Sequence, residues 1–164
     1  MATRRLSIIG SLNPDSSGNV WWEPSSIALA NDRYPGLLLR YKDTATKIKA
    51  SGSFTVPKDY ANSPKLIIIW AINVTTGNVV WNAETKPIAS GESMDPSTDD
   101  DAVNVTSAVP GTALLQAVSS MTLSAAYVAD DHVQFSIDRD GTSGSDTAVA
   151  DALVWDVLFE YSDS

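Results

Sequence analysis

The stretch that most constrains the fold is residues 132–161, HVQFSIDRDGTSGSDTAVADALVWDVLFEY. Its first part alternates apolar Val133, Phe135 and Ile137 with polar residues, a period of two that predicts a strand with one buried and one solvated face. In residues 152–161 apolar side chains occupy odd and even positions alike, so this strand needs cover on both faces. The acidic, glycine-containing sequence between them is typical of a turn. We therefore expect a final β-hairpin around which the rest of the chain is organised.

Other segments repeat the strand pattern at short intervals. The most apolar run, residues 66–72, is β-branched and bounded by Pro64 and Asn73, which favours a buried strand over a helix. The TTGN sequence at residues 75–78 predicts a second hairpin turn. Turn residues recur along the chain, and we expect about eight to ten antiparallel strands with at most one short helix. The sequence therefore predicts an all-β fold, a jelly-roll-like β-sandwich.

The N-terminal residues differ in composition from the rest. Residues 1–19 consist of a short apolar patch followed by turn-forming residues, so we expect an N-terminal arm. Residues 20–164 then form a single β-sandwich domain, a size that fits one core. We expect the arm to bind a partner through basic and apolar side chains: Arg4, Arg5, Leu6, Ile8 and Ile9.

Composition limits the possible classes of protein. There is no cysteine, so neither disulfides nor thiolate chemistry contribute. No apolar run has the length of a membrane span or a signal peptide, so we expect a protein made in the cytoplasm without a membrane or nucleic-acid partner. The net charge of −9 divides into +4 for residues 1–65 and −13 for residues 66–164. If the two parts form separate surfaces, this polarity could steer docking; ordinary solubility charge is the alternative.

Catalytic chemistry has little support in the sequence. The single histidine, His132, lacks the nucleophile motif and the placed serine that a Ser/His/Asp triad requires. One histidine without cysteine also cannot supply the usual zinc ligands. We expect His132 to be structural, and we predict no catalytic residue, no cofactor and no enzymatic activity.

The acidic turn is a candidate calcium loop. Asp138, Asp140 and Gly141 resemble the first half of such a loop, and Asp146 could add an oxygen. The pattern lacks a further ligand before the glycine and a closing glutamate, so a solvated hairpin turn is the alternative. We expect no bound metal.

The chain contains five tryptophans, a large number for its length. Trp21 and Trp22 are adjacent, so on a strand they point to opposite faces and one of them can be exposed. An exposed tryptophan on a β-sandwich is suited to stacking on a sugar ring. The alternative places the tryptophans in structural positions, and for Trp70, Trp81 and Trp155 we expect the core or a subunit contact.

Five segments carry a family resemblance: PSSIALAND, SGSFTVP, KLIIIWAI, VQFSIDRDG and ADALVWDVLFEY. Together, over roughly residues 20–161, they resemble small virion structural proteins encoded in the genomes of tailed bacteriophages. The resemblance lies in the order of strands and turns, so it transfers no site residue. It implies a jelly-roll virion component, either a capsid decoration (cement) protein or a tail or baseplate accessory protein.

Two functions are therefore expected from the sequence. The first is a virion structural protein that binds the major capsid protein or another virion protein, stabilises the shell, and forms a trimer to cover its doubly apolar strands. The alternative is a carbohydrate-binding or receptor-binding module that uses Trp21 or Trp22.

Overall fold

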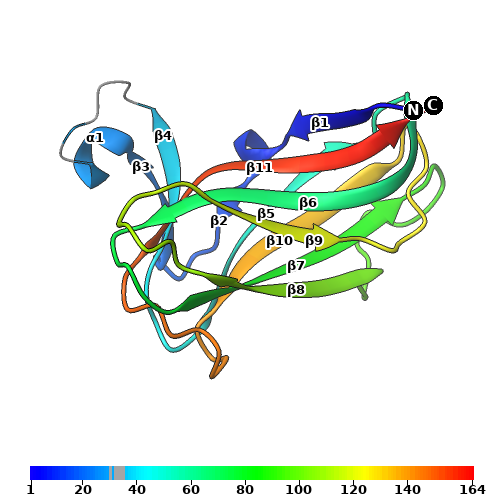
Figure 1. The fold of residues 1–164 in the computed structure, drawn as a ribbon. Helices are drawn as coiled ribbons and strands as arrows, with labels where there is room; N and C mark the ends of the chain where they lie inside the picture. Colours follow the sequence, from blue (N-terminus) through cyan, green and yellow to red (C-terminus); the bar gives the residue numbers. More distant parts are fainter. Residues whose placement is uncertain (30, 32–35) are drawn as a thin grey trace.

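The computed structural model of the protein describes residues 1–29, 31 and 36–164. Two antiparallel sheets pack face to face, as Figure 1 shows. The predicted jelly-roll-like β-sandwich is thus confirmed. Helical structure in this part of the chain is limited to a 3-10 turn, η1 (Ile9–Ser11), and one short helix, α1 (Ser25–Ala28). Neither helical element, nor any other within the described residues, has the length and apolarity needed to cross a membrane.

The first sheet has six strands in the order β3-β4-β11-β6-β9, and β1 also pairs with β11. Its strands are β1 (Thr3–Ser7), β3 (Val20–Pro24), β4 (Leu37–Tyr41), β6 (Tyr60–Ile72), β9 (Ala117–Thr122) and β11 (Ala152–Asp163).

The second sheet has five strands in the order β2-β5-β10-β7-β8. Its strands are β2 (Asn13–Pro14), β5 (Lys47–Thr55), β7 (Asn78–Ile88), β8 (Asp101–Ala108) and β10 (His132–Asp140).

Both predicted hairpins are wrong, because each turn connects one sheet to the other. β6 lies in the six-stranded sheet and β7 in the five-stranded sheet, and β10 and β11 are divided in the same way. The two turns touch at Gly77, whose φ is +100°. A Cβ on this glycine would lie 2.8 Å from the backbone of Ala148, so the close approach requires glycine.

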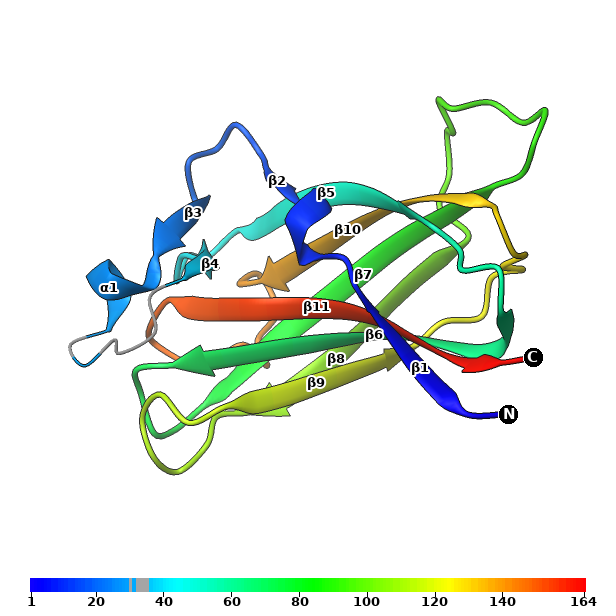
Figure 2. The same ribbon diagram turned by 90° about the horizontal axis from the view of Figure 1, so that it is seen from above.

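The N-terminal residues form part of the sandwich, so the predicted arm is wrong. β4 pairs with only the first three residues of β11, and β1 occupies the same edge of β11 farther along, from Ser7↔Leu158 to Thr3↔Ser162. In Figure 2 β1 lies across the far end of β11. Ile8 and Leu12, just after β1, are buried in the core at 4% and 2% exposure. The arm is ordered because it completes a strand edge and fills the core.

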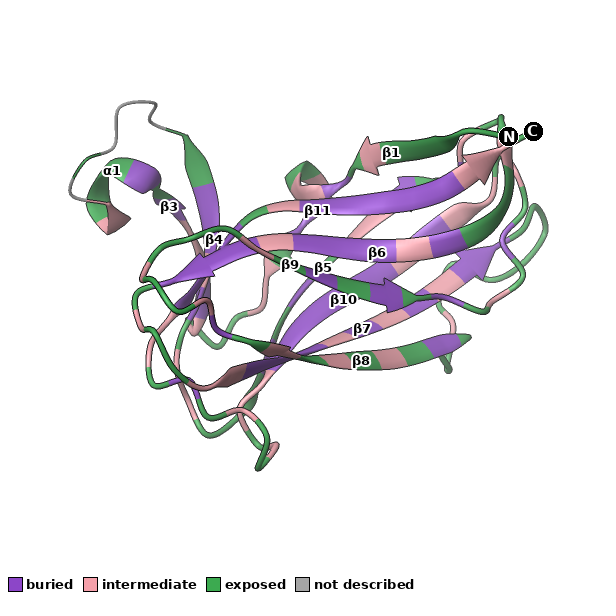
Figure 3. Cartoon of the chain, viewed as in Figure 1, coloured by how far each residue is buried: buried purple, intermediate pink, exposed green. Residues whose placement is uncertain are grey.

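Burial of the two longest central strands, β6 and β11, extends to both faces (Figure 3). Trp70 and Trp81 are fully buried and form a T-shaped pair with ring centroids 5.8 Å apart, as predicted for core residues. Trp155 is different, because a register shift between Val154 and Asp156 places it at a bulge with 36% exposure. A core position for Trp155 is therefore wrong.

The two parts of the chain do not form separate surfaces, so the condition for an electrical polarity is not met. Basic residues of the first part pair with acidic residues of the second: Arg4 with Asp163, Arg5 with Glu160 and Lys47 with Asp138.

Candidate functional site

The side chains expected to bind a partner do not form one site. The Nε of Arg4 and of Arg5 lie 2.9 Å and 2.8 Å from carboxylates of β11, so both arginines tie β1 to that strand. Ile8 is buried in the core, and the half-buried side chains of Leu6 and Ile9 pack against it. All five residues therefore have structural contacts within the chain.

The adjacent tryptophans of β3 point to opposite faces, as predicted. Trp22 packs against the core, and its indole N–H donates to the Leu12 carbonyl over 3.2 Å. Trp21 is half-buried on the outer face, where the guanidinium carbon of Arg40 lies 5.5 Å from the ring centroid. Arg40 is held there by carboxylates of Glu23 and Asp151 at 2.7 Å and 2.9 Å. The ring of Trp21 thus already carries a cation–π partner.

The acidic turn is organised around a buried arginine. Arg139 is 1% exposed, and its Nε and Nη2 donate to both oxygens of Asp146 at 3.1 Å and 2.8 Å. Its remaining donors bond the carbonyls of Ala148 and Ala150 and, at 3.3 Å, the carboxylate of Asp43. Asp146 is therefore committed to the guanidinium, which no sequence pattern had indicated.

The other two candidate calcium ligands face elsewhere. Asp140 accepts from the backbone and hydroxyl of Thr142 and from Asn82, and the hydroxyl bond is the main cause that lowers its pKa. Asp138 is buried beneath Lys47. No group of three or more potential metal ligands occurs in residues 1–29, 31 and 36–164.

We therefore predict that chelation leaves thermal stability nearly unchanged. Each turn carboxylate already has a partner within the protein, so we expect no cation to bind there. Chelation then has no bound cation to remove, and the folded state loses no stabilisation from ligand binding. Thermal melts with and without EDTA test this. A large fall in Tm that added calcium reverses, but added magnesium does not, would show that the turn binds calcium.

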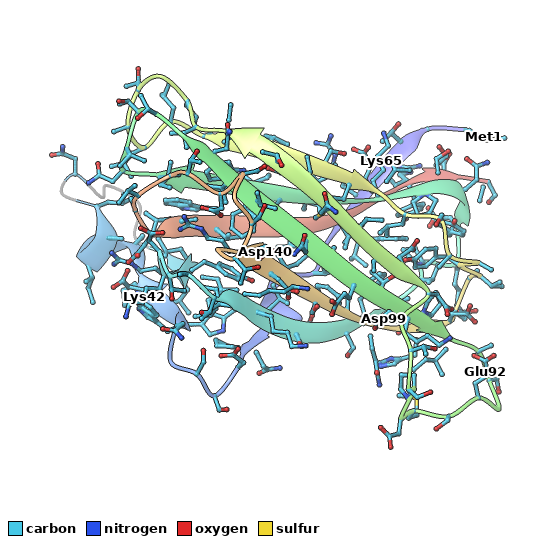
Figure 4. The ribbon with its side chains drawn as sticks, turned by 90° about the horizontal axis from the view of Figure 1, so that it is seen from below. Met1, Lys42, Lys65, Glu92, Asp99 and Asp140 are labelled. Atoms are coloured by element: carbon cyan, nitrogen blue, oxygen red, sulfur yellow. The ribbon has the colours of Figure 1, made fainter. Side chains whose placement is uncertain are left out.

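The outer face of the five-stranded sheet carries a polar groove. Two adjoining hollows form it, with volumes of about 420 Å³ and 270 Å³, and Glu84 lines both. Figure 4 looks onto this face, on which Asp99 and Asp140 are labelled. The first hollow is lined by Lys49, Ser51, Gly52, Ser53, Glu84, Lys86, Pro96, Asp99, His132, Gln134, Phe135 and Ser136. The second is lined by Lys47, Asn82, Ala83, Glu84, Ala102, Val103, Asn104 and Asp140.

The register of three strands brings these side chains together. β10 lies between β5 and β7, so Gln134 is flanked by Ser53 and Lys86, in line with one another across the sheet. Two residues along, Ser136 is flanked in the same way by Ser51 and Glu84. Because alternate residues of a strand share a face, each such row points its polar side chains outward.

An ion-pair cluster crosses the middle of the groove. The Nζ of Lys47 reaches over β10 to lie 2.9 Å from Asp138 Oδ2 and 3.0 Å from Glu84 Oε1. Asp138 is fully buried, and apart from this ion pair neither of its oxygens accepts a hydrogen bond from the described residues.

The cluster shifts the pKa values of its members. Burial raises the pKa of Asp138, while the hydrogen bond from Lys47 lowers the pKa of Glu84. Partial burial tends to lower the pKa of Lys47, but the bonds to both carboxylates outweigh it and raise the pKa to about 12. Lys47 is therefore a permanent cation at neutral pH.

The wall of the first hollow is fastened to the sheet by polar contacts. Lys86 pairs with Asp100 at 2.7 Å, and the side-chain amide of Gln134 donates to the carbonyl of Met94 over 2.9 Å. Both contacts hold the loop after β7 beside the groove. His132, expected to be structural, lines the hollow and is half-exposed.

Sequence reasoning missed this groove. One signal was present, since Gln134, Ser136 and Asp138 alternate with apolar residues and predict the solvated face of a strand. The neighbours of that face come from β5 and β7, and the sequence did not indicate that β10 pairs with both.

Comparisons with known proteins give a fold but no family. The fold is shared with an adhesin domain. This is the K1 cleaved adhesin domain of Lys-gingipain from Porphyromonas gingivalis W83, with a TM-score of 0.54 and 11% identity over 99% of each chain. No family model matches the protein, and no curated protein matches it.

Two carbohydrate-binding modules are more distant in structure. TmCBM61 in complex with β-1,4-galactotriose has a TM-score of 0.49 and 8% identity, over 98% of this chain and 88% of that one. The CBM22-1 xylan-binding domain of Paenibacillus barcinonensis Xyn10C has a TM-score of 0.49 and 12% identity, over 98% of this chain and 92% of that one. None of the three structures is described as a virion protein, so the phage resemblance stays a prediction.

Proposed function

We propose that the protein is a carbohydrate-binding β-sandwich module whose ligand occupies the polar groove of the five-stranded sheet. The observation that carries the proposal is the groove itself. It combines hydroxyls of Ser51 and Ser53, the amide of Gln134 and the amine of Lys49 along a single hollow. Sugar hydroxyls both donate and accept hydrogen bonds, so a surface that mixes these groups complements them.

Binding rather than hydrolysis is favoured by the carboxylates of the groove. A glycosidase generally needs two carboxyl groups that flank the scissile bond. Glu84 and Asp138 are brought together by Lys47, but Asp138 is fully buried beneath that lysine. The pair therefore cannot flank a sugar linkage in this structure, which supports the proposal of a module without catalytic activity.

The proposal predicts that the double variant Lys49→Ala/Gln134→Ala binds glycans about tenfold or more weakly. Each substitution removes a hydrogen bond worth about 0.5–1.5 kcal/mol, or more where a charge takes part, and 1.4 kcal/mol corresponds to a factor of ten. Screening of the intact protein on a glycan array identifies a ligand, and isothermal titration calorimetry then compares the two proteins.

The matched control is Lys65→Ala/Gln116→Ala. It removes the same two side-chain types from the six-stranded sheet and its adjoining loop. The control should bind like the unmodified protein. Equal losses in the two double variants, or the absence of any glycan ligand, would overturn the proposed site.

A virion role stays a prediction, as do the trimer and the location in a particle. Its expected anchor is committed to the sandwich, because Arg4 and Arg5 form ion pairs and Ile8 is buried. Cryo-electron microscopy of a parent particle would test that role directly.

A further inference from the structure

The length of the groove and the balance of charged residues along it restrict which glycans it can bind. Its two hollows follow β10 from His132 to Asp140. Eight steps along a strand at about 3.4 Å each give a groove about 27 Å long. That is several times the length of one sugar ring, so a single terminal sugar would leave most of the groove empty.

The formal charges along the groove cancel. The two hollows are lined by three lysines and by three acidic residues, Glu84, Asp99 and Asp140. The buried carboxylate of Asp138 lies beneath them and shares Lys47 with Glu84, so it adds no excess of cations to the groove. A groove built for a polyanion would instead present an excess of cations.

Two of the three lysines are already committed. Lys47 lies between Asp138 and Glu84, and Lys86 pairs with Asp100. Lys49 has no ion pair among the described residues, although Asp15 and Glu84 are near enough to be influenced by its charge. The chain as a whole carries −9, which adds long-range repulsion toward acidic polymers.

We infer that the groove binds an internal segment of an extended, uncharged glycan chain. The inference rests on the proposed function. Sugar hydroxyls can alternate donation and acceptance along the mixed lysine, serine, amide and carboxylate surface without requiring a net charge. A carboxylated chain would instead place its charges beside Glu84, Asp99 and Asp140.

Matched pairs of oligosaccharides test the inference. Neutral β-1,4-glucan and β-1,4-mannan oligosaccharides, from the disaccharide to the hexasaccharide, are compared by calorimetry with the corresponding glucuronan and mannuronan oligosaccharides. Galactan and xylan oligosaccharides extend the neutral series. For the neutral glycan that binds, affinity should rise severalfold with length and change little with salt. If the ligand is a glucan or a mannan, its carboxylated counterpart should bind about fivefold or more weakly than the neutral chain. If the ligand is a galactan or a xylan, the glucuronan and mannuronan oligosaccharides should bind more weakly than it by the same factor.

A charge variant makes the test sharper. Asp99→Lys changes the groove from neutral to cationic, so it should raise the affinity for the carboxylated chains relative to the affinity for the neutral chains. Because Asp99 is exposed in a loop, the fold should tolerate the change.

Three outcomes separate the inference from the proposed function. Tight, salt-sensitive binding of the carboxylated series would overturn the inference while leaving carbohydrate binding intact. The inference is also overturned, with carbohydrate binding intact, if the disaccharide binds as tightly as the hexasaccharide. If no glycan of either series or on the array binds, the proposed function is wrong and the inference falls with it.

Discussion

Deletion of residues 2–12 is expected to unfold the domain or to remove most of its stability. The deletion removes β1, which pairs with five residues of β11, and it empties the core positions of Ile8 and Leu12. Burial of an aliphatic side chain contributes about 1.5–3 kcal/mol, so two of them account for much of the 5–15 kcal/mol by which a typical domain is stable. Urea unfolding followed by tryptophan fluorescence measures the loss.

A milder variant and a control keep this prediction testable if the truncated protein does not fold. Ile8→Ala should cost about 2–5 kcal/mol, because it leaves a cavity in the core. Arg4→Ala/Arg5→Ala removes the charges of the same segment but keeps its backbone and core contacts, and exposed ion pairs contribute about 0–1 kcal/mol each. If the truncated protein unfolds at the same urea concentration as the full chain, the N-terminal residues do not contribute to the stability of the domain, and the arm predicted from the sequence is correct.

The sequence predicted the strands well because their signals are local. Apolar runs and the turn residues around them predicted strands at residues 66–72 and 152–161, and these lie within β6 and β11. What local signals could not decide is which sheet the next strand joins. The turns after β6 and β10 have hairpin composition, yet both cross between sheets. Turn chemistry specifies that the chain reverses, and the register of distant strands determines where it goes.

The candidate site depended on the same non-local information. The sequence indicated Trp21 and Trp22 as candidate sugar-stacking residues. In the structure the guanidinium of Arg40 lies over the ring of Trp21, and the indole N–H of Trp22 donates to the carbonyl of Leu12. The groove is instead built from short polar side chains such as Ser51 and Ser53, which are common on any solvated strand. Their meaning depends on the pairing of β5, β10 and β7, and nothing within a single segment encodes that order.

Trp155 shows how a small irregularity alters an otherwise sound prediction. The strand pattern of residues 152–161 correctly predicts burial on both faces, and Leu153 and Leu158 are buried within a single chain. The bulge at Trp155 exposes one large side chain on that strand. Only the surface around Trp155 on this strand would therefore need to be covered by another subunit. The expected trimer stays a prediction, which light scattering tests.

The main stabilising contact of the acidic turn, the ion pair between Arg139 and Asp146, could not be predicted from the sequence. No sequence pattern indicated a structural role for Arg139, whose side chain is 1% exposed. Its five contacts come from Asp43 and from residues 146–150, so they join the loop before β5 to the crossover between the sheets.

Two control variants allow the contribution of this arginine to be measured. Arg5→Met removes an exposed guanidinium that pairs with Glu160 and should cost less than about 1 kcal/mol. Arg139→Met/Asp146→Leu removes both partners of the buried pair.

Arg139→Met is expected to destabilise the domain by about 3–5 kcal/mol, since breaking a buried ion pair leaves an uncompensated charge. Methionine keeps most of the apolar stem, so the loss comes from the polar groups rather than from packing. Asp146, 3% exposed, would keep only the backbone N–H of Val80 as a donor, and the carbonyls of Ala148 and Ala150 would lose theirs. Urea unfolding gives the change in free energy, and the double variant should recover part of it because the stranded carboxylate is gone. A single variant within about 1 kcal/mol of the unmodified protein would mean that water replaces the guanidinium at little cost. In that case the crossover between β10 and β11 is held by the strands on either side of it.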